Sequence, residues 1–399
     1  MLNKLYNVRF YHGEFLLLIT LALFGMDFML HGIILLILYG VVFCVNNKTL
    51  SSRYIGGILA FFFAFVLFYI MSSRFEAAIL KNVIAVLVAA LIGCKIKGCT
   101  AEKICFYIVF IALFMALHAM LNMAYNYSQL GVLAIAERTA YDFWTQDISA
   151  ATGQASKLTP FIACSFYLIF YNKNTYLRLL SVILLFATVI FDLGLAGRSA
   201  LVLLLFSIVL SYFIGSMRAK KVSSSAKVLV FVGLAVVALF FAYSIDLFGI
   251  QEIFEESSFN QRFNSPSGQD IDEDDRTRRK LIFLSHLLDY PFGGQHLCYD
   301  LKVGHAHDLW LDTFDMAGLL PLLLLVGYTL ASIYRAYRFY NRPVNPYIAT
   351  LVLVFFIIMN IQFYLEPIIE GSPKLLIFYC LIDSMVSRYL SQKTLLNFK

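Results

Sequence analysis

The sequence predicts an all-α polytopic membrane protein with about twelve transmembrane helices and one large, partly helical loop on the outer side of the membrane. The first observation is composition. Of the 399 residues, 60% are hydrophobic and 14% are charged, whereas soluble domains carry roughly 25% charged residues. The second is a series of long apolar runs. The third is one long polar segment, residues 249–308, which interrupts them and indicates that something polar is handled there.

Apolar runs that are long enough to cross a bilayer as helices, about 17–25 residues each, predict the number of spans. The runs lie near 13–30, 32–45, 55–72, 77–94, 104–124, 158–172, 178–195, 199–216, 227–247, 309–333, 346–365 and 373–391. We therefore expect a single membrane domain that comprises residues 1–399.

The positive charges predict the orientation, because short cytoplasmic loops collect Lys and Arg. More than half of the 31 Lys and Arg residues fall into segments on the same side as the N-terminus. Both termini are therefore expected in the cytoplasm, with the 249–308 loop outside. This topology accounts for the net charge of +6, so the charge indicates no nucleic-acid partner. The first apolar run lacks a small-residue cleavage site and is expected to remain as an anchor.

An outer segment at 125–157 carries aromatic and charged residues together, among them Arg138, Asp142 and Trp144. This pattern is typical of a short helix that lies in the membrane interface. Two interpretations remain open. The segment is either an aromatic belt that sets its depth in the bilayer or a lip over a lipid-borne substrate.

Arg198 follows two glycines, Gly194 and Gly197, at the expected outer start of a helix. Glycines at such a position favour a tight reversal with close backbone approach. An arginine on this reversal is well suited to bind a diphosphate bidentately.

The large loop has an acidic first half and a basic, helical second half. Asp270 and Asp272 match the short Asp-x-Asp metal pattern, but such a run is more often a solvated surface. From Arg276 to Leu288 the apolar residues follow helical spacing, and the turn signals at 290–294 end the helix.

The loop ends in a second polar motif, Gly304-His305-Ala306-His307-Asp308. Asp308 can cap the following helix, which places His307 at the membrane surface. Two histidines in this spacing also suggest zinc, but no second compact ligand pair accompanies them. We expect neither a metal nor another cofactor. A compact outer turn at 364–373 carries Glu366 and Glu370, which are expected to pair with loop arginines.

Together these features resemble the O-antigen ligase and O-antigen polymerase superfamily. The resemblance covers roughly residues 192–321 and rests on the order of five elements: Gly197-Arg198-Ser199, Arg276, Pro291-Phe292-Gly293-Gly294, His307-Asp308 and Gly318.

The resemblance implies an inverting, metal-independent glycosyltransferase of the bacterial inner membrane. Such enzymes transfer a glycan from undecaprenyl diphosphate to an acceptor sugar at the periplasmic face. Arg198 and Arg276 would bind the diphosphate, Arg278 and Arg279 compete with Arg276 for this role, and His307 would be the catalytic base. The candidate supporting residues are Asp308, His305, Arg138 and Glu366.

Three functions therefore remain in view. We favour an O-antigen ligase, whose acceptor is the lipid A-core of lipopolysaccharide. The alternative within the superfamily is an O-antigen polymerase, whose acceptor is another lipid-linked repeat. A polysaccharide or lipid transporter is the alternative from another class, but it is expected to show related halves and midplane charges.

Overall fold

The computed structural model describes residues 10–11, 13–46, 55–72, 74–131, 139–194, 198–219 and 271–396. The expected span at 227–247 and residues 249–270 of the large loop lie outside these ranges. The same is true of Arg138.

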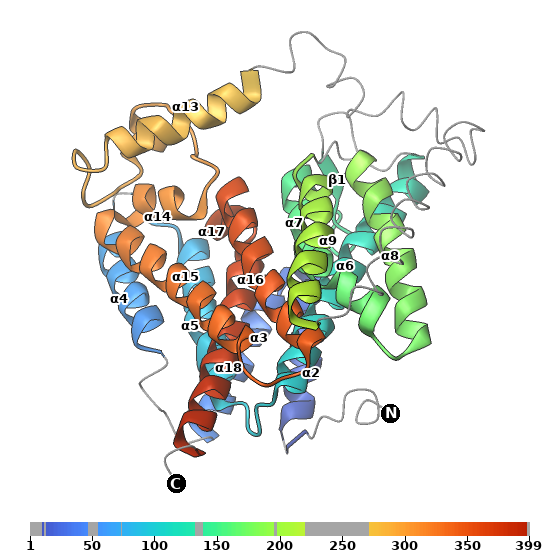
Figure 1. Ribbon diagram of the computed structural model, residues 1–399. Coiled ribbons are helices and arrows are strands. Elements are labelled where there is room, and N and C mark those ends of the chain that lie inside the picture. The colour runs from blue at the N-terminus through green and yellow to red at the C-terminus, as the bar shows by residue number, and fades with distance from the viewer. Residues whose placement is uncertain are drawn as a thin grey trace.

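The described chain is almost entirely helical (Figure 1). Its α-helices are α2 (Glu14–Gly25), α3 (Gly32–Asn46), α4 (Gly56–Ile70), α5 (Ala77–Lys95), α6 (Ala101–Leu130), α7 (Ala151–Phe166), α8 (Thr175–Gly194), α9 (Arg198–Ala219), α13 (Ile271–Ser285), α14 (Leu309–Ala317), α15 (Leu319–Tyr340), α16 (Pro346–Leu365), α17 (Ile368–Gly371) and α18 (Pro373–Leu396). Shorter helical turns are η1 (Phe28–Leu30), η3 (Tyr167–Tyr171) and η5 (His296–Asp300).

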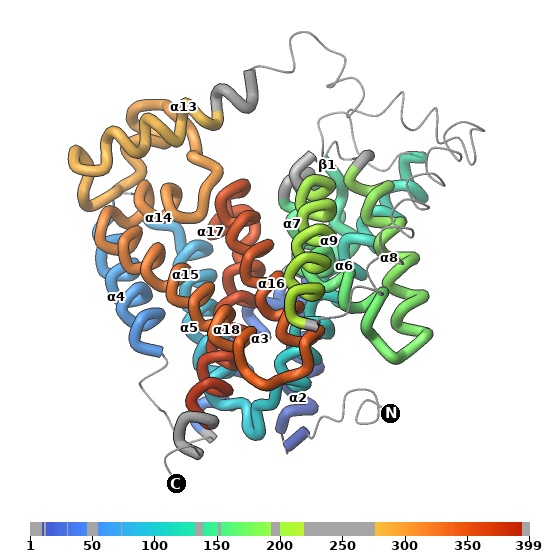
Figure 2. Tube along the Cα trace, in the orientation of Figure 1, coloured from blue at the N-terminus to red at the C-terminus, as the bar shows by residue number. Residues whose placement is uncertain are grey.

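Six helices of the described chain are long and apolar enough to cross a membrane: Ala77–Lys95, Ala101–Leu130, Thr175–Asp192, Ala200–Arg218, Leu319–Tyr340 and Pro346–Leu365. Three further apolar helices, α2, α3 and α4, are shorter. The prediction of an all-α membrane protein is confirmed at this level, and consecutive helices such as α4, α5 and α6 run in alternate directions (Figure 2).

The expected single span at 309–333 is wrong, because the chain breaks there into α14 and α15. Gly318 lies between them with φ +91, a conformation that favours glycine. A Cβ atom on Gly318 would stand 2.4 Å from the carbonyl oxygen of Pro291. That same oxygen accepts a hydrogen bond from Leu319 N at 2.8 Å. The turn at 290–294 therefore packs directly onto the backbone of the break.

The expected interfacial helix within 125–157 is also wrong for its described part. Residues 139–150 form an antiparallel hairpin in which β1 (Thr139–Tyr141) pairs with β2 (Ile148–Ala150), in the register Ala140 opposite Ser149. Asn126, near the end of α6, holds this hairpin, because its side chain donates to Tyr141 O and accepts from Tyr141 N, each at 3.0 Å. The backbone of this segment is thus held by the Asn126 side chain of α6 and by strand pairing, and not by the hydrogen bonds of a helix.

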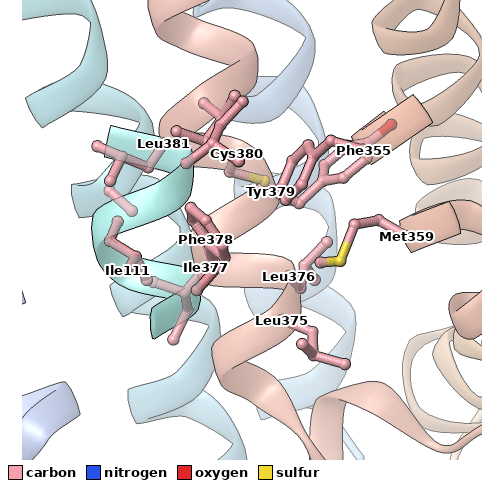
Figure 3. Packing of buried hydrophobic residues seen from close by; sticks show 14 of the residues in the cluster. Ile111, Phe355, Met359, Leu375, Leu376, Ile377, Phe378, Tyr379, Cys380 and Leu381 are labelled. Atoms are coloured by element: carbon pink, nitrogen blue, oxygen red, sulfur yellow. The ribbon is translucent and has the colours of Figure 1, made fainter. Parts of the chain in front are cut away.

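The centre of the bundle is α18, which packs along α5 and also contacts α6, α15 and α16. Tyr379 is fully buried and meets Phe356 and Phe363 with ring centroids 4.9 and 5.1 Å apart. Figure 3 shows this packing around Ile377 to Leu381. In lipid, such van der Waals contact, rather than exclusion from water, holds helices together.

Small residues allow the closest helix contacts. A Cβ atom on Gly93 of α5 would stand 2.4 Å from the backbone oxygen of Leu381 in α18. The two backbones therefore approach each other as closely as glycine permits, which is typical of helix pairs in membranes.

The two ends of the bundle differ in character. One end holds the hairpin, α17 and α14, with α13 lying across it (Figure 1); we call it the loop end. At the opposite end, Lys103 and Glu14 form a buried ion pair at 2.7 Å.

Candidate active site at the loop end

The candidate site consists of the loop 301–308, which leads into α14, and the helix α13 that lies over it. Asp308 caps α14, because its carboxylate accepts hydrogen bonds from Trp310 N and Leu311 N at 2.9 and 3.1 Å. The predicted cap is thus confirmed. It satisfies backbone donors that the first helical turn leaves unpaired.

His307 is displayed by a strained backbone. Its φ is +55, a left-handed conformation that is uncommon for residues other than glycine and that clusters at functional sites. The side chain is half-buried, and its Nδ1 atom has no hydrogen-bond partner among the described residues.

Asp312 holds this strained loop from below. Its Oδ1 atom accepts from Ala306 N at 3.0 Å, and its Oδ2 atom accepts from Asp308 N at 3.2 Å. The carboxylate therefore binds the backbone on both sides of His307. Asp312 is buried, so this pairing also satisfies the carboxylate where water is excluded.

The basic face of α13 points toward the loop. Arg276, Arg279 and Lys280 are half-buried, whereas Arg278 is exposed. Residues three and four apart share one face of a helix, and a residue two positions away does not. This periodicity separates Arg276 and Arg279 from Arg278, which the sequence left as competitors.

Two contacts fix the position of α13. Lys280 Nζ donates to the backbone oxygen of Tyr364 at 2.6 Å and lies 3.7 Å from the Asp308 carboxylate. Arg279 lies against the loop, because a Cβ atom on Gly304 would stand 3.2 Å from its Nη1 atom.

The positive charges of α13 affect the pKa of His307. Burial, followed by the positive charges of Arg276 and Arg279, lowers the pKa of its imidazole to about 4. An unperturbed histidine has a pKa near 6.5. Around neutral pH, His307 is therefore uncharged and can accept a proton, as a weaker base than an unperturbed imidazole.

Among the described residues, His305 contacts Glu370 and Cys298. Its Nδ1 atom lies 3.4 Å from Glu370 Oε2 and 3.5 Å from the sulfur of Cys298. Within the described residues, Glu370 forms its ion pair with His305 and not with an arginine. Glu366 is buried and lies two residues beyond Tyr364, the acceptor of Lys280.

Arg198 is the first residue of α9, which starts at the loop end (Figure 1). Its side chain lies outside the described part of the structure, as does all of Arg138, so their expected roles remain predictions.

Sequence reasoning overlooked Asp312. The sequence did offer a signal for Asp312. It is an acidic residue in a mainly apolar helical turn, and it lies four positions after the capping Asp308, so both residues share one helix face. Sequence reasoning also overlooked Lys280 as the residue that joins α13 to the turn at 364–366.

Within the described ranges, no group of three or more His, Cys, Asp or Glu side chains is arranged to hold a metal ion. Comparison with protein-family models and with curated proteins finds no match to this chain.

Proposed function

We propose that the chain is a membrane glycosyltransferase that transfers a glycan from undecaprenyl diphosphate to an acceptor sugar. The observation that carries the proposal is the neutral His307 beneath the two arginines Arg276 and Arg279, at one end of a bundle of membrane-length helices. This arrangement supplies a base and a cationic anchor in one place.

The chemistry proceeds as a single displacement. His307 accepts the proton of the acceptor hydroxyl, and the hydroxyl oxygen attacks the anomeric carbon. The bond from that carbon to the diphosphate oxygen breaks, and its electron pair leaves with the diphosphate. Attack opposite the leaving group inverts the anomeric centre. Fixed guanidinium groups stabilise the negative charge that develops on the leaving group, where a buried, preorganised cation is most effective.

The test is transfer by the purified protein in nanodiscs, supplied with an undecaprenyl diphosphate-linked glycan. His307→Ala removes proton transfer and is expected to lower kcat by roughly 10²–10⁴-fold. Arg276→Ala and Arg279→Ala are expected to raise the KM for the donor, whereas Arg278→Ala, the exposed neighbour on the same helix, is the matched control. Full activity of the three site variants would refute the proposal.

We further propose the ligase reaction, in which the acceptor is the lipid A-core. The surface glycans of a deletion strain decide between this reaction and polymerisation. A ligase deletion removes all O-chains from lipopolysaccharide and leaves polymer on the carrier lipid. A core that bears a single repeat would instead identify a polymerase.

A further inference from the structure

A polar pocket lies at the loop end, apart from the loop 301–308, between the hairpin, the start of α7, Asp27 after α2, and α17. Its volume is about 260 Å³, and its lining includes the carboxylates of Asp27, Asp142 and Asp147, the amine of Lys157 and the hydroxyls of Thr145 and Ser149. Ligand pockets for drug-sized molecules span roughly 300–1,000 Å³, so this pocket suits one small polar unit.

The inner wall of the pocket is a network of buried charges. Asp142 is 3% exposed, and its Oδ2 atom lies 3.1 Å from His118 Nε2 and 3.7 Å from Lys157 Nζ. Burial opposes ionisation of Asp142, but the His118 and Lys157 contacts outweigh it and lower the pKa of the carboxyl below its ordinary value. Asp27 is paired in the same way with Lys374 at 2.7 Å.

Neutral side chains fix the orientation of this wall. Asn122 donates to Gln154 Oε1 at 2.9 Å and to Asp142 Oδ2 at 3.4 Å. Its own carbonyl oxygen accepts from Phe143 N at 2.8 Å. Asp142 is therefore held in place before any ligand arrives, which reduces the entropy lost on binding.

The pocket adjoins the candidate active site through α17. Gly371, the last residue of α17, lines the pocket. Its neighbour Glu370 contacts His305 at 3.4 Å, two residues before His307. One short helix thus borders the pocket and reaches the loop that carries the proposed base.

The lining predicts the charge of the ligand. Three aspartates line the pocket together with Lys157, and Lys374 pairs with Asp27 beside it. One negative charge is left in excess, so anions such as phosphates or uronic acids are disfavoured. Carboxylates accept hydrogen bonds from hydroxyl or ammonium groups, and the hydroxyls of Thr145 and Ser149 can donate or accept. A ring that carries several hydroxyls, with or without an amino group, complements this pattern.

We propose that this pocket is a subsite for a neutral or amino-bearing sugar ring of the glycan substrates. The proposal rests on the proposed function, because it assumes that the neighbouring site handles glycans. Asp147 and Ser149 are the residues best suited to contact the sugar, since Asp147 is exposed and Ser149 half-exposed at the pocket.

The experiment measures binding of methyl glycosides of glucosamine, glucose and glucuronic acid to the full chain in nanodiscs, by saturation-transfer NMR. The glucosamine and glucose glycosides are expected to bind, and the glucuronic acid glycoside is not. Asp147→Asn is expected to weaken binding of the glucosamine glycoside roughly tenfold, the effect of about one charged hydrogen bond. Ser149→Ala serves as a second variant. The control is Asp289→Asn, which changes an exposed acidic residue in the turn after α13.

Kinetics identify which substrate supplies the sugar. A rise in acceptor KM in Asp147→Asn assigns the subsite to the acceptor, and a rise in donor KM assigns it to the donor glycan. Active protein that binds no neutral or amino glycoside, or variants that bind as wild type, would overturn the subsite and leave the proposed function standing. Glycoside binding that depends on Asp147, in a protein without transferase activity, would support the pocket and refute the function.

Discussion

At the residue scale, the state of His307 is set by its neighbours rather than by its own chemistry. Its pKa of about 4 follows from burial and from the positive charges of Arg276 and Arg279. We predict that the acidic limb of kcat/KM falls near pH 4 instead of near 6.5, because kcat/KM reports the free enzyme. Below that pH the imidazole holds a proton and cannot act as a base; above it the base is available.

The same reasoning gives the sign of a mutational shift. Arg276→Ala removes a positive neighbour, so the pKa of His307 rises and the acidic limb moves toward neutral pH. Arg278→Ala moves the limb less than Arg276→Ala, because Arg278 is exposed and is not among the main causes of the shift. Profiles of kcat/KM between pH 4 and 8 test both statements, and a limb at the same pH in the Arg276 and Arg278 variants would contradict them.

Asp312 is a positioning residue in this scheme. Asp312→Asn keeps one acceptor oxygen and loses the other, so either Ala306 N or Asp308 N loses its partner. A small displacement of a catalytic group can lower the rate by about 10²-fold. We predict a fall in kcat with little change in donor KM, measured beside Asp289→Asn as control. If Asp312→Asn instead lowered the yield of folded protein and left kcat unchanged, the role of Asp312 would be purely structural.

Some of this site can be predicted from the sequence. Arg276, Arg279 and His307 belong to short motifs whose helical spacing and turn signals are local. The pairing of His305 with Glu370 has no such signature, because it depends on how α17 packs against α14. The left-handed backbone of His307 was not predicted either, although the Asp312 contacts that accompany it are local in sequence.

At the scale of elements, the break between α14 and α15 shows how tertiary contact overrides an apolar run. Residues 309–333 are continuously membrane-like in sequence, yet the turn at 290–294 occupies the space that a side chain on Gly318 would need. A hydropathy profile reports only the length and polarity of an apolar run. It cannot predict a helix break that is caused by contact with another loop. The hairpin at 139–150 escaped prediction for a similar reason, because its partner is Asn126 of α6.

This break makes a prediction about stability. Gly318→Ala places a Cβ atom 2.4 Å from Pro291 O at a residue with φ +91 and ψ −174, so it combines backbone strain of about 1–3 kcal/mol with overpacking of about 1–3 kcal/mol. Gly131→Ala is the control, because Gly131 also has a positive φ, +68, and no described atom lies within 4 Å of the position of its Cβ. Thermal unfolding in detergent is expected to show the larger loss for Gly318→Ala. Equal losses would mean that strain alone matters there.

At the scale of the whole molecule, basic residues occur at both ends of the bundle but have different neighbours at each end. Away from the site, Lys95 Nζ donates to Cys44 O at 2.8 Å and Arg388 donates to Cys94 O. Cys44 and Cys94 lie in the last turns of α3 and α5, where cations stabilise the negative end of the helix dipole. The basic residues there thus serve the bundle, whereas those of α13 face a site.

The distribution predicts orientation, because basic residues accumulate on the cytoplasmic side. In a background with Cys44→Ser and Cys94→Ser, the remaining native cysteines are buried, so a new cysteine reports its own side of the membrane. Ser285→Cys on α13 is exposed at the loop end, and Asn341→Cys is exposed after α15 at the opposite end. A membrane-impermeant maleimide is expected to label Ser285→Cys in intact cells with a permeabilised outer membrane, and Asn341→Cys only after lysis. The reverse pattern would put His307 in the cytoplasm, where the proposed transfer at the outer face does not occur, and the site would then need a different substrate.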